Sequence, residues 1–270
     1  MYALLALYAC TGAPAPAPAV HLTLAGSSTV QPVAEIAAQA YEKLHPGVTV
    51  DVQGGGSSVG ISAARSGLAT IGMVSRALTP DEADLVGTTI GQDGITLITN
   101  AANPATALSH DQIVQIYGGT AVSWAAVGGE DHPITVINKE EGRATRELFE
   151  KFFALKDKMV PSAVIIGPNG QAITTVAGNP WAVAYVSIGS ASTAIEQGAP
   201  IRQLQTDGVV PSTATVRDGT WPLMRPLTLV TKGPPTDAAQ DFINFVLSPE
   251  GQAIVTKEDF VPAVHATASP

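Results

Sequence analysis

The sequence predicts an α/β protein with two mostly parallel sheets, each flanked by helices. Short runs of β-branched residues alternate with amphipathic stretches from residue 21 onward, which is the pattern of strands and helices in parallel sheets. This alternation restarts after about residue 100, which indicates a second sheet. A chain of 270 residues holds one large domain or two ordinary ones.

The first half of the chain is expected to contain strand and helix units joined by short loops. The opening strand covers residues 21–25. A helix follows over residues 30–44, with apolar side chains at helical spacing and a stop at Pro46. The further expected elements are strands at 48–52 and 70–74, a short helix that ends near Gly67, and a helix start with a capping box at Thr79 and Glu82.

The second half repeats this pattern. Its expected strands lie at 95–99, 134–137, 163–166 and 182–186. Its expected helices are one capped by Ser109 and Gln112, one at 145–155 and one at 171–177. The C-terminal part adds a strand at 226–231 and a long helix from Thr236. The pattern alone does not decide which of the two sheets this helix covers.

Composition and charge exclude several classes of protein. A chain that is 45% hydrophobic and 14% charged has enough apolar surface to fold, so a disordered chain is excluded. Its 14 Lys and Arg against 23 Asp and Glu give a net charge of −9, so we expect no nucleic-acid partner. The sequence has no apolar run long enough to predict a membrane-spanning helix.

Cysteine and histidine usage argues against metal and redox sites. One cysteine excludes an internal disulfide framework, a thiolate zinc site and a Cys-x-x-Cys redox centre. The five histidines are scattered without metal-ligand spacing. We therefore expect neither a metal ion nor a cofactor.

Cys10 lies between an apolar segment and a run rich in Ala and Pro. The sequence Leu-Tyr-Ala-Cys that ends there resembles the lipobox of bacterial lipoproteins, in which the cysteine is lipidated and becomes the mature N-terminus. Residues 1–19 would then hold a signal remnant, the lipobox and a semi-extended tether. No basic residue precedes Cys10, so we expect the true signal to begin upstream. An incidental thiol in a frayed terminus is the alternative.

Four loops rich in Gly, Ser and Thr each follow an expected strand and open a helix. They lie at residues 26–29, 54–58, 75–76 and 138–145. In open α/β sheets, ligands bind at the carboxyl ends of the strands, where helix N-termini present unpaired N–H groups and partial positive charge. Helix capping alone explains any single loop. Four together predict a site for a small oxyanion.

One short segment concentrates charge in a chain that has little of it. It carries the three cations Lys139, Arg143 and Arg146 and the two carboxylates Glu140 and Glu141. Arg146 lies one turn inside the expected helix, so we expect it to form surface salt bridges. The rest of the segment marks where we expect the anion to sit.

Enzyme motifs are missing from the sequence. It has no Gly-x-Ser-x-Gly elbow and no Gly-Lys-Ser/Thr phosphate loop. A phosphomonoesterase on these loops would need Ser28, Ser57 or Ser75 as its nucleophile. No histidine or metal cluster lies in the loops to activate a hydroxyl. We therefore expect a binding protein and not an enzyme.

Five motifs together carry a resemblance to a known family. They lie at residues 26–30, 54–61, 71–76, 138–146 and 218–227, the last containing Gly-Thr-Trp-Pro-Leu and Arg-Pro-Leu. In this order, from about residue 21 to 262, the chain resembles the phosphate-binding lipoproteins of bacterial phosphate ABC transporters.

The resemblance implies a two-lobed type II periplasmic binding protein fold, or Venus-flytrap, with a mostly parallel sheet in each lobe. Residues 20–99 and 224–265 would form the first lobe, and residues 100–223 the second. The family also implies inorganic phosphate in the interlobe cleft and delivery to an ABC transporter permease. We expect a monomer in the cell envelope, periplasmic or extracytoplasmic, that is lipid-anchored through Cys10.

Matching by position implies phosphate-binding residues in all four loops. They are Ser28, Thr29, Ser57, Ser58, Ser75, Arg76, Lys139, Arg143, Ala144 and Thr145. Lys139 stands where the family commonly has an arginine. The family's Ser-Gly-Thr signature reads Arg143-Ala144-Thr145 here. Because arginine can bind an oxyanion through two parallel hydrogen bonds, we expect Arg143 to be a direct or near ligand.

A second departure bears on selectivity. Some family members keep an aspartate just after the third-loop serine, where this chain has Arg76. A buried carboxylate accepts a hydrogen bond from the O–H of protonated phosphate and repels sulfate, which has no proton to donate. Glu140 or Glu141 is the candidate replacement. If neither serves, sulfate, molybdate, tungstate and arsenate become alternative ligands. A phosphate sensor or surface protein without a permease is a further alternative.

Overall fold

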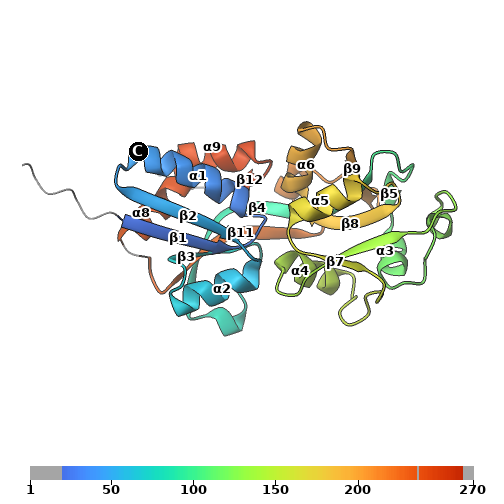
Figure 1. Ribbon diagram of the computed structural model, residues 1–270, viewed down its shortest axis with the longest axis horizontal. Coiled ribbons are helices and arrows are strands. Elements are labelled where there is room, and N and C mark those ends of the chain that lie inside the picture. Colours follow the sequence, from blue (N-terminus) through green and yellow to red (C-terminus); the bar gives the residue numbers. More distant parts are fainter. Residues whose placement is uncertain (1–19, 236, 264–270) are drawn as a thin grey trace, which may run out of the picture.

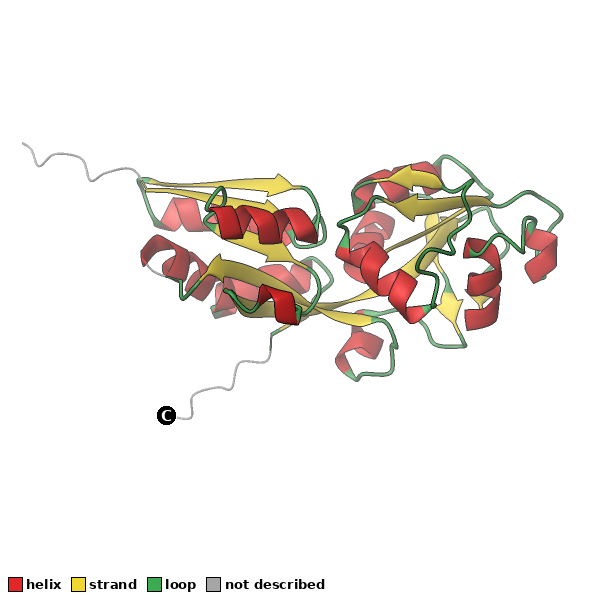
Figure 2. Ribbon diagram, turned by 90° about the horizontal axis from the view of Figure 1, so that it is seen from below, coloured by secondary structure: helices red, strands yellow, loops and turns green. Residues whose placement is uncertain are grey.

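The computed structural model describes residues 20–235 and 237–263. These residues form two lobes, which lie side by side along the long axis of the molecule (Figure 1). Each lobe combines a sheet with flanking helices, as the sequence predicts (Figure 2). Cys10 and the Ala/Pro segment lie outside the described residues, as does Thr236. None of the described helices is long and apolar enough to cross a membrane.

The first lobe contains elements from both ends of the chain. They are β1 (Val20–Gly26), α1 (Gln31–Leu44), β2 (Val48–Gly54), α2 (Ser57–Ser66), β3 (Ile71–Val74), the 3₁₀ helix η1 (Pro80–Glu82), α8 (Asp237–Leu247), α9 (Pro249–Lys257) and β12 (Val261–Pro262).

The second lobe contains the middle of the chain. Its elements are β5 (Ala107–Leu108), α3 (His110–Tyr117), the 3₁₀ helix η2 (Trp124–Val127), β6 (Thr135–Lys139), α4 (Ala144–Phe152), β7 (Val164–Ile166), α5 (Asn169–Ala177), β8 (Ala182–Ser187), α6 (Ile188–Glu196), β9 (Ile201–Gln203), β10 (Gln205–Thr206) and α7 (Thr213–Arg217).

A single long strand joins the sheets of the two lobes. β4 (Leu85–Asn100) pairs antiparallel with β11 (Met224–Lys232) over its first part and antiparallel with β8 over its last part. The main path of the sheet is therefore continuous, in the order β2-β1-β3-β11-β4-β8-β6-β7. The prediction of two separate sheets was wrong in this respect. β4 stays extended through the junction because β11 supplies partners for the backbone groups of its first part.

The parallel parts of the sheet agree with the sequence. β1 pairs parallel with β2 and β3 in the first lobe, and β6 pairs parallel with β7 and β8 in the second. The expected strand at 95–99 is only the second half of β4. The capping box of Thr79 and Glu82 is present, but it closes a 3₁₀ helix of three residues rather than an α-helix. The helices α6, α7 and α9 were not expected.

The two lobes are stabilised by separate apolar clusters. In the first, α1, α8 and α9 pack on the sheet around Tyr41 and Phe242, whose rings meet edge to face at 5.3 Å. In the second, Phe149 stacks on Tyr185 at 3.9 Å and packs against Tyr117. The exact domain boundaries expected at 99/100 and 223/224 stay a prediction.

Close backbone packing in the first lobe sets the positions of the loops at its rim. Gly60 of α2 lies against β1 and β3, where a Cβ atom would come within 2.6 Å of the Met73 oxygen and 2.9 Å of the Ala25 oxygen. Gly26 ends β1 with φ +135°, and a Cβ atom there would clash with the same Met73 oxygen. These contacts bring the ends of β1 and β3 close to the start of α2.

We predict that Gly60→Ala destabilises the protein by about 1–3 kcal/mol, because the added methyl group meets backbone atoms that cannot move aside cheaply. Gly170→Ala in α5 is the matched control. A Cβ atom there meets nothing within 4 Å, so only helix propensity changes. Urea unfolding measures both variants. Equal stability of the two variants would contradict the packing argument.

Candidate functional site

A buried ion pair lies where the two lobes meet. Arg225, the second residue of β11, lies directly opposite Asp93 of β4. Its Nε and Nη2 atoms donate to Asp93 Oδ2 at 3.1 and 2.9 Å, and both side chains are at most 1% exposed. Burial lowers the pKa of Arg225, and the Asp93 carboxylate opposes that effect. Each charge stays buried because the other one compensates it.

Arg225 also donates to hydroxyl groups of both lobes. Nη2 reaches Thr29 Oγ1 at 3.0 Å, while Nη1 reaches Ser75 Oγ at 3.2 Å and Thr145 Oγ1 at 2.8 Å. Thr29 and Ser75 belong to first-lobe loops, and Thr145 belongs to α4 of the second lobe. A guanidinium group has no acceptor, so each hydroxyl must turn its own proton elsewhere. Arg225 therefore orients three hydroxyls from two lobes as donors.

Two further serines hold the first-lobe hydroxyls in place. Ser27 accepts from the Thr29 backbone N–H at 3.2 Å and donates to Ser75 Oγ at 2.9 Å. Ser57 accepts from the Ser75 backbone N–H at 3.1 Å. All four residues are buried. We call Ser27, Thr29, Ser57, Ser75, Thr145 and Arg225 the hydroxyl cluster.

Helix N-termini converge on the same place. α2 begins at Ser57 of the hydroxyl cluster, and α4 has Thr145 as its second residue. α1 begins two residues after Thr29. Neither α1 nor α2 has an acidic residue in its first turn, so the positive ends of their dipoles are not compensated locally. An anion at this point would gain from these dipoles.

Lys139 adds a buried amine to this region. The residue is 2% exposed, and Nζ donates to the Gly167 oxygen at 3.4 Å. Burial, together with the charges of Arg225 and Arg143, lowers the pKa of Lys139 to about 7, and Glu140 opposes this shift. An incoming anion would favour the charged form of this amine.

Arg143 lies between loops of the two lobes. Its Nη2 donates to Glu140 Oε2 at 2.9 Å, and its side chain is 12% exposed. Its Nε is buried and has no hydrogen-bond partner among the described residues. A Cβ atom on Gly56 of the first lobe would come within 3.0 Å of Arg143 Cδ, and one on Gly167 within 2.9 Å of Nη2. The Arg143 guanidinium is therefore enclosed by loops of both lobes, and its Nε–H donor is unused within the part of the chain that the structure describes.

Arg76 has a different role from the one expected. Its guanidinium donates to both carboxylate oxygens of Glu82 at 2.7 and 2.8 Å and to Glu147 Oε2 of α4 at 2.8 Å. Ser58 donates to the other Glu147 oxygen at 3.4 Å, and its N–H donates to the Gly142 oxygen at 3.1 Å. Arg76 and Ser58 therefore form contacts between the lobes. The Arg76 guanidinium is already hydrogen-bonded to Glu82 and Glu147.

The remaining expected residues lie at the edge of the cluster or outside it. Ala144 is buried at the start of α4, while Ser28 lines a neighbouring cavity. The Glu140 side chain is 54% exposed and is held by Arg143. The Glu141 side chain is 90% exposed and lies 3.8 Å from Arg146. Neither glutamate reaches into the hydroxyl cluster. Arg146 forms the expected salt bridge, with Glu150 at 2.6 Å, but the two side chains are only 22% and 12% exposed, and Arg146 also donates to the Lys139 oxygen at 3.1 Å.

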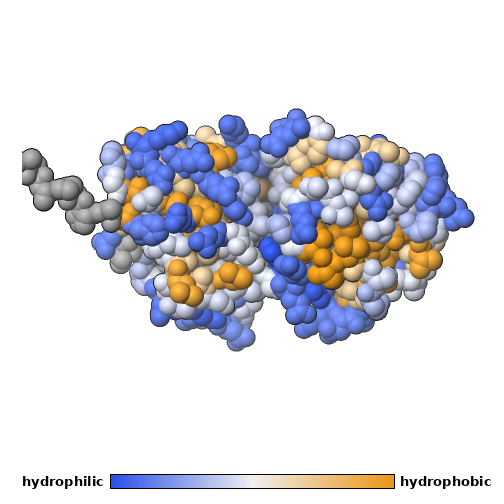
Figure 3. Space-filling model, in the orientation of Figure 1, coloured by the Kyte–Doolittle hydropathy of each residue, from blue (hydrophilic) through white to orange (hydrophobic). Residues whose placement is uncertain are grey.

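The arrangement can bind a small anion. Its donors are hydroxyls, helix N-termini and cations, and hydrophilic residues gather near the junction of the lobes (Figure 3). The Arg225 guanidinium that touches three of the hydroxyls cannot accept a proton, so it cannot act as their general base. Among the described residues, no group of three or more His, Cys, Asp or Glu side chains could hold a metal ion.

Comparison with known proteins identifies the family. A family model for the PBP superfamily domain matches residues 12–250. A crystal structure from Clostridium perfringens, described as a phosphate ABC transporter substrate-binding protein with bound phosphate, is 33% identical with a TM-score of 0.85. The match covers 90% of this chain and 100% of that one. The chain is a PstS-type member of the PBP superfamily.

Other PBP superfamily proteins agree with this assignment. The phosphate-binding protein PstS of Borreliella burgdorferi is 26% identical over 250 residues, which are 89% of each chain. PstS of Bacillus subtilis is 27% identical over 246 residues, 89% of this chain and 80% of its own. The crystal structure of an ABC-type phosphate transport receptor from Vibrio cholerae has 31% identity and a TM-score of 0.69, and covers 90% of this chain.

Sequence reasoning did not include Arg225, Asp93, Ser27 or Asn169 among the site residues of this PBP superfamily member. A charged residue inside a strand is buried only when it is paired, but this signal was missed for both Arg225 and Asp93. The expected strands began at residues 226 and 95, so both residues lay just outside them. Asn169 opens α5 and donates to Thr29 of the other lobe at 3.1 Å, a contact that no local pattern indicates.

We predict that Lys139→Met stabilises the anion-free protein most at low pH. The pKa of Lys139 is lowered from 10.5 to about 7 on folding, so below pH 7 the folded protein bears the full cost of a buried charge. Between pH 7 and about pH 10 that cost falls, because the folded protein releases this proton before the unfolded chain does. The stability gap between variant and wild type should shrink by up to about 1.4 kcal/mol per pH unit in this range.

Urea unfolding of both proteins from pH 6 to pH 10, after removal of bound anions, measures this gap. Taking the difference between the two proteins cancels the titration of all other groups. A gap that does not change with pH would contradict a lowered pKa for Lys139.

Proposed function

We propose that this protein binds inorganic phosphate between its lobes and delivers it to the membrane permease of an ABC importer. The observation that carries the proposal is the set of hydrogen bonds from Arg225 to Thr29, Ser75 and Thr145. These bonds join both lobes and leave the three hydroxyl protons available to an anion. The bound phosphate of the Clostridium perfringens relative supports the choice of anion.

Charge supports the same ligand. Asp93 compensates Arg225, and Glu140 compensates Arg143, while Lys139 forms no salt bridge in the part of the chain that the structure describes. A small dianion can draw on the Arg143 Nε donor, the Lys139 ammonium and the helix dipoles together. The net charge of −9 does not oppose this, because an enclosed ion responds to the groups beside it.

Closure of the lobes would secure the anion. Contacts between the lobes include Arg76 with Glu147 and Asn169 with Thr29. β4 and β11 connect the lobes near Asp93 and Arg225, which suits a hinge. Closing excludes water and so strengthens each hydrogen bond to the anion, and a permease can recognise the closed shape.

The cellular setting is part of the proposal. We propose that the protein works outside the cytoplasm as a monomer that is lipid-anchored through Cys10, and that it acts as a carrier and not as an enzyme. Support comes from the lipobox-like sequence at Cys10 and from the relatives, which are named for phosphate binding and transport.

A different oxyanion is the second candidate, and one observation favours it. Arg76 replaces the acceptor of the family pattern, and Glu140 and Glu141 stay outside the hydroxyl cluster. A site built mainly from donors also suits sulfate, molybdate or tungstate, which carry no proton at neutral pH. Calorimetric titration with each anion separates the two candidates.

We predict that Arg143→Ala lowers phosphate affinity by about ten- to a hundredfold, because a charged donor is lost from an enclosed site. Arg217→Ala is the matched control. It removes an exposed arginine at the end of α7 that is not part of the hydroxyl cluster, so phosphate affinity should stay within about twofold of wild type. Isothermal titration calorimetry on anion-free protein measures both. Undiminished binding by Arg143→Ala would show that Arg143 is no ligand.

A further inference from the structure

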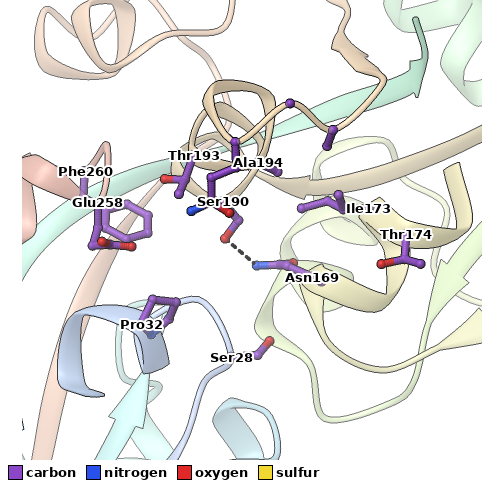
Figure 4. A pocket seen from close by; sticks show the side chains of 14 residues that line it. Ser28, Pro32, Asn169, Ile173, Thr174, Ser190, Thr193, Ala194, Glu258 and Phe260 are labelled. Carbon is purple, nitrogen blue, oxygen red and sulfur yellow. Dashed lines mark hydrogen bonds between the residues drawn. The ribbon is translucent and has the colours of Figure 1, made fainter. Parts of the chain in front are cut away.

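Asn169 presents an acceptor beside a cluster of donors. It is the first residue of α5 and is 3% exposed. Its Nδ2 donates to Thr29 Oγ1 at 3.1 Å and to Ser190 Oγ at 3.2 Å, the second of which is drawn in Figure 4. Its Oδ1 is buried and has no hydrogen-bond partner among the described residues. Thr29 Oγ1 also accepts from Arg225, so the Asn169 amide is bonded directly to a residue of the hydroxyl cluster.

Several buried side-chain atoms have no hydrogen-bond partner among the described residues, and two of them belong to Arg143 and Asn169 near the site. Arg143 Nε is a buried donor, and Asn169 Oδ1 is a buried acceptor. A buried polar atom without a partner is unfavourable unless a ligand supplies one. A fully deprotonated oxyanion can satisfy only the donor. An oxyanion that keeps a proton can satisfy both atoms.

The charged acceptors near the site are already engaged. Asp93 Oδ2 accepts two bonds from Arg225, and Oδ1 is 3.4 Å from the Gly189 N–H. Arg143 holds Glu140. Arg76 holds both Glu82 and Glu147. Each of these carboxylates is thus tied to an arginine, whereas the Asn169 carbonyl oxygen has no partner among the described residues.

We propose that the side-chain carbonyl of Asn169 accepts the hydrogen bond from the proton of bound phosphate and so selects protonated tetrahedral oxyanions over unprotonated ones. This inference rests on the proposed function. At neutral pH, phosphate and arsenate carry a proton, and sulfate and molybdate do not. A neutral amide leaves sulfate with one unfavourable oxygen contact but adds no charge repulsion, so the selectivity is smaller than that of a carboxylate.

Titration of anion-free wild type and Asn169→Ala with phosphate, arsenate, sulfate and molybdate at pH 7 tests the proposal. Removing the acceptor should weaken phosphate and arsenate about tenfold more than sulfate and molybdate. Ser190→Ala is the matched control. It removes the other acceptor of the same amide and keeps the carbonyl, so the phosphate to sulfate ratio should stay within about twofold.

Asn169→Asp provides a second test that does not depend on the alanine variant folding. The aspartate keeps an acceptor and adds a negative charge, so the phosphate to sulfate affinity ratio should rise at least tenfold over wild type. Thermal unfolding of each variant, recorded by circular dichroism, confirms that it is folded at the temperature of titration.

Two outcomes would overturn the proposal, and a third concerns the function itself. If Asn169→Ala weakens all four anions by the same factor, the residue only positions Thr29. An unchanged ratio in Asn169→Asp would exclude contact between the side chain and the proton of the anion. If wild type binds none of the four anions, the proposed function fails, and the inference fails with it.

Discussion

A buried charge needs a partner, and the pairing of Arg225 with Asp93 meets this need where the lobes join. The two residues face each other on β11 and β4, the strands that connect the lobes. Arg225 donates to Asp93 through Nε and Nη2. Its Nη1 and Nη2 atoms also donate to the hydroxyl groups of Thr29, Ser75 and Thr145. One ion pair therefore fixes the meeting point of the lobes and turns their hydroxyls into donors.

The three cations of the site differ in how their charges are compensated by neighbouring carboxylates. Arg225 and Arg143 each have a carboxylate beside them, whereas Lys139 is buried near both arginines and only Glu140 offsets its cost. A lysine can release its proton when no anion is present, and an arginine cannot. With lysine at this position, the site avoids a third permanent buried cation when no anion is bound. Affinity for a dianion then becomes linked to proton uptake.

Much of the fold follows from local patterns, and the exceptions have physical causes. The strand and helix alternation predicts the parallel parts of both lobes, because period-two and helical patterns reflect burial of one face. Residues 85–94 of β4 were missed because Gly87, Gly91 and Gly94 interrupt the pattern. Pairing with β11, which lies far away in sequence, keeps the backbone of these residues extended. No local pattern carries that information.

The sequence by itself determined the α/β class, the Gly, Ser and Thr loops, and the concentration of charge between Lys139 and Thr145, because these depend on residue type and short-range spacing. Tertiary structure decided which side chains are available. Arg76 is paired with Glu82 and Glu147, Glu141 faces solvent, and Asn169 joins the site. A side chain binds a ligand only with hydrogen-bonding capacity that its neighbours leave unused, and those neighbours come from distant parts of the sequence, which only the tertiary structure brings together.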